Sequence, residues 1–250
     1  MSTQITCHIM AVRGLCDGDA GRGQSSPIAM VLIIGLMIAG TTAVVVLGGV
    51  AITDTQDRLD ARTAENTMTQ LDSQASLVAL GASARQEVNL GPSNNEYRVN
   101  NNSGQMTVRV GGKEILQEDL GSVVYEDESG TKIAYQGGGV WRTDGDGNSV
   151  MISPPELHYR NKTLTLPLVT VEGDSSLDGS AVITQNTSTK EYPNETLSQT
   201  NPVTRGKVEV VIQSEYHEAW DAYLRSRTDG GVHHEPENNK ITLTLKQQDK

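Results

Sequence analysis

Residues 28–52 read IAMVLIIGLMIAGTTAVVVLGGVAI, and this stretch decides how the rest of the chain is interpreted. It contains no charged residue. At ~1.5 Å per residue, a helix of this length spans roughly 37 Å, which exceeds the ~30 Å hydrocarbon core of a bilayer. Its glycines at positions 35, 40, 48 and 49 fit either close helix–helix approach or ordinary membrane composition. The stretch predicts a transmembrane helix over residues 24–53.

The charges on either side of this stretch predict its orientation. Arg13 and Arg22 precede it, whereas Asp54, Asp57 and Asp60 follow it. Positive charge is retained in the cytoplasm, so we expect a cytoplasmic N-terminus and an extracellular C-terminal part. The predicted location is therefore the cell membrane, crossed once, with membrane lipid as a partner.

A second helix-forming stretch follows directly. Residues 54–81 contain no proline, and apolar residues recur in them with a loose spacing of three and four, up to Val78. Gly81 is a suitable helix stop. The pattern predicts an extracellular helical stalk. It is either continuous with the apolar helix or a separate helix packed on the outer domain.

Residues 92–250 change to short β-type runs separated by turn-forming clusters, which is typical of an antiparallel sheet. Residues 163–166 and 242–245 alternate Thr and Leu, so each predicts a strand with one wet and one dry face. Residues 215–227, EYHEAWDAYLRSR, show helical amphipathicity instead. The predicted fold class is α+β: a long N-terminal helix, transmembrane and then amphipathic, followed by an antiparallel β-rich domain with one short helix.

Charge and cysteine content limit the classes of function. The chain has 20 Lys+Arg and 31 Asp+Glu, a net charge of -11. An acidic surface lacks the clustered cations that nucleic acid requires, so we expect no nucleic-acid partner. Cys7 and Cys16 both lie in residues 1–23, a leader or cytoplasmic tail. The rest of the chain therefore has no disulfide or thiolate chemistry.

No residue set predicts catalysis or a cofactor. The chain has no phosphate-binding glycine loop, no Gly-x-Ser-x-Gly elbow and no His-Glu-x-x-His motif. His233 and His234 are adjacent, so on a strand they point to opposite faces, and nothing in the sequence brings His158 or His217 to them. The cluster at 144–148 lacks the final glutamate of a calcium loop. We predict a protein that is not an enzyme and holds no metal and no cofactor.

Four Asn-x-Ser/Thr sequons lie in the predicted outer domain. They begin at Asn101, Asn161, Asn186 and Asn194. Each is a candidate glycosylation site if the domain is extracellular.

The junction ahead of the apolar stretch resembles a processing signal. Arg22-Gly23-Gln24 leading into a long apolar run is similar to the class III signal of archaellins and archaeal type IV pilins. The resemblance implies that a prepilin-type peptidase cuts between Gly23 and Gln24 and leaves the helix in the mature protein. Pro27 and the lack of a glutamate at Ile28 depart from the pilin pattern. An uncleaved signal-anchor is the alternative.

From Arg22 onward the chain resembles an uncharacterised group of haloarchaeal proteins with archaellin-like N-termini. The resemblance rests on residues 22–25, 72–81 (DSQASLVALG), 135–142 (YQGGGVWR) and 153–155 (SPP). It implies a pilin-like, membrane-anchored archaeal surface protein, a minor subunit of a type IV pilus-like or archaellum-like filament with other pilin-like subunits as partners. The alternative is a single-pass surface binding module that does not polymerise; an ectoenzyme is disfavoured.

Overall fold

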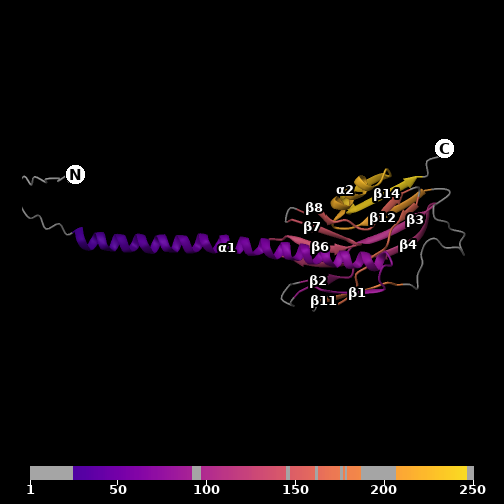
Figure 1. Ribbon diagram of the computed structural model, residues 1–250. Helices are drawn as coiled ribbons and strands as arrows, with labels where there is room; N and C mark the ends of the chain where they lie inside the picture. The colour runs from indigo at the N-terminus through magenta and orange to yellow at the C-terminus, as the bar shows by residue number, and fades with distance from the viewer. Residues whose placement is uncertain are drawn as a thin grey trace, which may run out of the picture. The chain divides into compact units, whose positions relative to one another are not determined.

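A computed structural model of the chain describes residues 25–91, 97–144, 147–160, 163–174, 177, 179–186 and 207–246 (Figure 1). The chain divides into two compact units, Met1–Ile52 and Thr53–Lys250.

The fold class predicted from the sequence is wrong. The structure is β-rich, with 40% strand and 31% helix. Among the residues it describes, no helix is both long and apolar enough to cross a membrane. The prediction rested on the absence of charge over residues 28–52, and absence of charge alone does not establish what covers a segment. Within this stretch the hydroxyls of Thr41 and Thr42 donate hydrogen bonds to helix carbonyls.

Helix α1 covers Ser25–Ala79 and contributes to both units. In the second unit it has one buried face, because its small and apolar residues are spaced by three and four. The buried residues of this stripe are Ala61, Ala64, Met68, Leu71, Ala75 and Val78. The helix ends before Gly81, which takes the left-handed conformation (φ +79°) and donates its N–H to the Val78 carbonyl.

One five-stranded antiparallel sheet of the second unit has the order β2-β5-β6-β7-β8. Its strands are β2 (Arg98–Asn100), β5 (Ser122–Glu126), β6 (Lys132–Gln136), β7 (Gly139–Thr143) and β8 (Ser149–Ser153). Gly137 and Gly138, both with positive φ, form the two-residue turn that joins β6 to β7.

The other five-stranded antiparallel sheet has the order β13-β14-β12-β3-β4. Its strands are β3 (Gln105–Val110), β4 (Lys113–Asp119), β12 (Lys207–Gln213), β13 (Gly231–Glu235) and β14 (Lys240–Lys246). Leu243 and Leu245 of β14 are buried, whereas Thr242 and Thr244 are half-buried, so this strand has the two faces expected from its alternation.

Smaller elements complete the second unit. They are the strand pairs β1 (Arg85–Asn89) with β11 (Ser180–Thr184) and β9 (His158–Arg160) with β10 (Thr163–Thr165), helix α2 (His217–Arg227), and the 3-10 turn η2 (Pro236–Asn238). The segment after β10 passes very close to Gly121. The Val171 N–H donates a hydrogen bond to the Leu120 carbonyl, and a Cβ added to Gly121 would lie 2.0 Å from the Val171 carbonyl oxygen. Only glycine fits this approach.

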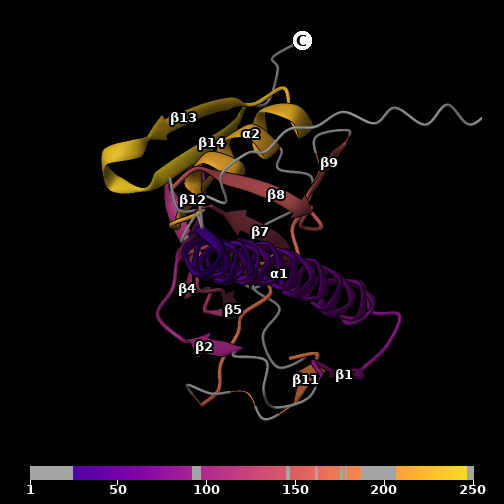
Figure 2. The same cartoon turned by 90° about the vertical axis from the view of Figure 1, so that its left-hand side faces the viewer.

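Two hydrophobic clusters form the core of the second unit. One joins the two sheets and α2, and its largest side chains are Trp141 and Trp220. The other joins the buried stripe of α1 to β5–β7 and to β1 and β11. In Figure 2, β7 is seen above α1 and the pair β1 and β11 below it. Residues 54–81, predicted as a stalk, thus contribute a central helix to the β-rich unit.

Candidate functional site

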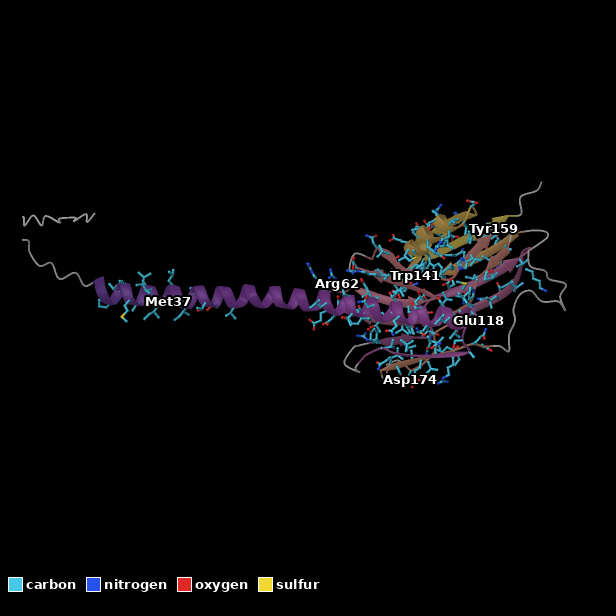
Figure 3. The ribbon with its side chains drawn as sticks, viewed as in Figure 1. Met37, Arg62, Glu118, Trp141, Tyr159 and Asp174 are labelled. Atoms are coloured by element: carbon cyan, nitrogen blue, oxygen red, sulfur yellow. The ribbon has the colours of Figure 1, made fainter. Side chains whose placement is uncertain are left out.

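The part of α1 in the first unit exposes large aliphatic side chains, and we call residues 28–38 the apolar segment. Their exposed fractions run from 48% for Ile34 to 74% for Leu36. Successive helical residues are rotated by ~100°, so the consecutive exposed residues Val31, Leu32, Ile33 and Ile34 cover all sides of the helix. Met37 marks this segment in Figure 3. A helix that is apolar all round is normally covered, so this segment is a candidate interaction site.

Gly35 adds a second property to the apolar segment. A Cβ built at Gly35, or at Gly40 just beyond the segment, would meet nothing within 4 Å. These glycines leave the helix backbone accessible, so another helix can approach it closely.

Polar contacts hold the α1 stripe on its sheet in the second unit. Arg142 of β7 donates to Glu65 of α1 over 2.7 Å and to Asp144 over 2.9 Å. The hydrogen bonds to these two carboxylates raise the pKa of Arg142, and the bond to Asp144 has the larger effect. Each ion pair is partly exposed and contributes on the order of 0.2–1 kcal/mol, so burial of the stripe outweighs them.

Asp72 is a buried carboxyl at the same contact. It accepts a hydrogen bond from the Ser153 hydroxyl, and its other oxygen has no partner among the described residues. Burial raises its pKa to about 6, and the Ser153 bond offsets part of that rise. The nearby Tyr135 hydroxyl is also buried without a hydrogen-bond partner among the described residues. Burial raises the pKa of Tyr135, and the Asp72 charge raises it further.

Several residues predicted from the sequence lie outside the described residues. They are the processing residues Arg22, Gly23 and Gln24 and the sequons at Asn161 and Asn194. Asn186 is described and exposed. Asn101 is exposed, but its side-chain amide donates to the Gly173 carbonyl over 2.9 Å and accepts the Gly173 N–H over 3.0 Å. A glycan on Asn101 would disturb this contact.

Two histidines come together in a way that the sequence did not indicate. The ring nitrogens His217 Nδ1 and His234 Nε2 lie 2.7 Å apart. Burial, and then the neighbouring His234, lower the pKa of His217. His233 points elsewhere and is 76% exposed. The pair supplies only two metal-ligand atoms, and among the described residues no group of three His, Cys, Asp or Glu could hold a metal ion.

Comparison with known proteins gives one match. A model described as a family of unknown function, DUF7289, matches residues 22–250. Neither a curated protein nor a solved structure matches the chain. The match gives no function, so the archaellin-like resemblance and the prediction of a non-enzyme stay predictions.

Proposed function

Because the chain belongs to the family DUF7289, whose function is unknown, we propose from its own residues that it is a pilin-like archaeal cell-surface subunit. Its apolar segment associates with the same segment of other copies. The exposed apolar surface of residues 28–38 is the observation that carries the proposal.

The energetic argument concerns what covers the apolar segment. Burying one Ile, Leu, Val or Met side chain stabilises an assembly by about 1.5–3 kcal/mol. Nearly every residue of this segment has such a side chain in an exposed position. Leaving them in water is therefore unfavourable by an amount comparable to the stability of a typical domain, so we expect a cover.

Three features favour other copies as the cover. Gly35 and Gly40 admit a close neighbour, and the segment carries no charge that would oppose an identical helix. One helix, α1, supplies both the apolar segment and the central stripe of the β-rich unit. Residues 22–24 resemble a pilin processing signal, and the family match begins at Arg22.

The first test is the N-terminus of the native protein. We expect intact mass and N-terminal sequencing to give a chain that begins at Gln24, because the peptidase implied by the resemblance cuts after Gly23. A native chain that begins at Met1 or Ser2 would contradict processing and would favour the surface binding module that does not polymerise.

The second test separates assembly from folding. We expect Ile34→Asp to remove the protein from sheared cell-surface material, because a buried carboxylate in the helix contact is strongly unfavourable. The matched control is Val150→Asp on β8, since Ile34 is 48% and Val150 51% exposed. The control should be sheared off like the unmodified protein. Equal recovery of both variants would show that the apolar segment does not mediate assembly.

A further inference from the structure

Helix α2 meets strand β13 through the two histidines described above. His217 is the first residue of α2, and its Nδ1 lies 2.7 Å from Nε2 of His234 on β13. The ring planes are tilted by 47° with their centroids 4.9 Å apart, so the rings meet through these nitrogens and are not stacked. A hydrogen bond here requires one of the two nitrogens to carry a proton and the other to lack it.

The pair can accept one proton without losing this hydrogen bond. The outer nitrogen of His234, Nδ1, faces the Asp221 carboxylate of α2, with 3.9 Å between Nδ1 and Oδ2. A proton on Nδ1 is attracted by that carboxylate and leaves Nε2 able to donate to His217. Arg225 also binds Asp221, so the attraction is reduced but not removed.

A second proton is incompatible with the contact. It would place an N–H group on each of the two facing nitrogens and a positive charge on each ring. His217 lies in the first turn of α2, where the helix dipole disfavours a cation. Burial, and then the neighbouring His234, lower the pKa of His217, whereas Glu218 and Asp221 act in the opposite direction.

The other ionisable groups on the neighbouring strands have different partners. Glu235 of β13 binds Lys240 of β14 over 2.9 Å. His233 of β13 lies 3.9 Å from Glu235 and is 76% exposed, on the opposite face of the strand from His234. The balance of charge at the histidine pair is therefore set mainly by α2 itself.

We propose that the His217–His234 contact is a pH-sensitive switch, which holds the first turn of α2 on β13 and opens when both imidazoles are protonated. At neutral pH this turn is held on two sides, because the Ala219 N–H donates to the Ser149 hydroxyl of β8 over 3.0 Å. Opening removes the contact with β13 and leaves the contact with β8. The pair lies wholly within the second unit, so the switch does not depend on assembly through the apolar segment.

The direction of the pH effect follows from the lowered pKa of His217. The released histidine binds its proton at the ordinary pKa of ~6.5, more tightly than the docked one does. The stability of the contact is therefore fully present above that pH, and it is lost as the pH falls through the lowered pKa of the docked pair.

The first experiment is an NMR titration of the imidazole nitrogens in the full-length chain in detergent micelles. We expect His233 to titrate in one step. His217 and His234 should share two steps separated by more than about one pH unit, because their protonations are coupled. A single common step at the pH where His233 titrates overturns the proposal.

The second experiment is hydrogen exchange of the same chain at pH 7 and pH 5, corrected for the intrinsic exchange rate. Protection of residues 217–223 and 231–235 should fall about 3- to 10-fold on acidification. His234→Gln keeps a donor near the position of Nε2 but does not titrate, so it should remove most of this fall. His217→Asn replaces Nδ1 in the same way and should have the same effect.

His233→Gln is the matched control, because it removes an exposed imidazole from the same strand. It should keep the full loss of protection at pH 5. A loss that persists in both His234→Gln and His217→Asn, or that disappears in His233→Gln, overturns the switch. The NMR titration uses the unmodified chain, so it decides the question even if a variant fails to fold.

Discussion

Replacing Trp220 by alanine is expected to lower the free energy of unfolding of the second unit by about 3–5 kcal/mol. The Trp220 side chain is fully buried. Its ring lies 4.5 Å from that of Trp141, centroid to centroid, and Tyr223 meets it edge-on at 6.1 Å. Alanine removes both aromatic contacts and leaves a void between the sheets and α2. Pulse proteolysis of the full-length chain across a urea series measures the change.

The two tryptophans provide matched controls, because their indole N–H groups differ. Trp141 Nε1 donates to the Gln136 carbonyl over 3.0 Å, whereas Trp220 Nε1 is buried without a partner among the described residues. Phenylalanine at 220 removes an unpaired donor, but at 141 it deprives a buried carbonyl of its donor. We therefore expect Trp141→Phe to cost about 1–3 kcal/mol more than Trp220→Phe. Equal costs would contradict this difference.

Asp72→Asn is expected to stabilise the second unit above pH 6. Burial raises the pKa of Asp72 from 3.8 to about 6, so the folded state binds the proton more tightly than the unfolded state does. The associated stability is fully present below about pH 4 and is lost as the pH rises through 6. Asparagine is neutral throughout, and its oxygen can still accept from Ser153. At pH 7 the gain is about 3 kcal/mol, from ~1.4 kcal/mol per pKa unit.

The measurement is a series of urea unfolding curves between pH 4 and pH 8. The gain from Asp72→Asn should vanish near pH 4, where the native aspartate is protonated. Asp174→Asn is the control, because Asp174 is an exposed carboxyl (Figure 3) and its replacement should change stability by less than about 0.5 kcal/mol. A destabilised Asp72→Asn variant at pH 7 would mean that the ionised carboxylate has a partner that asparagine cannot replace.

Local periodicity was the reliable signal in this sequence. The spacing of Met68, Leu71, Ala75 and Val78 indicated a helix, and these residues form its buried face. The amphipathic pattern of 215–227 likewise corresponds to α2, where Trp220 and its neighbours are buried. Such patterns depend on residues within two or three turns, so one sequence suffices to find them.

Pairing between distant segments could not be read from the sequence. The run at 163–166 predicted a strand, but β10 stops at Thr165, because strand length depends on the partner, here β9. The contacts Glu65–Arg142 and Asp72–Ser153 join residues that lie 77 and 81 positions apart. The His217–His234 contact depends on α2 docking beside β13, which no local pattern shows.

The apolar stretch at 28–52 led to the wrong fold class for a related reason. Absence of charge shows that a segment avoids water, but it does not show what covers it. Bilayer, neighbouring copies and protein core all select uncharged residues. The same property therefore predicted a transmembrane helix and now supports assembly among copies.

The central position of α1 in the second unit has a consequence for biosynthesis. The helix leaves the ribosome before every strand that covers its stripe, and the last of these, β11, contains Ile183. About 100 residues separate Val78 from Ile183, which at ~5–20 residues per second means roughly 5–20 s of translation. During that interval the native cover of Met68 and Leu71 is incomplete. The nascent chain must be kept from aggregating until β11 has been made.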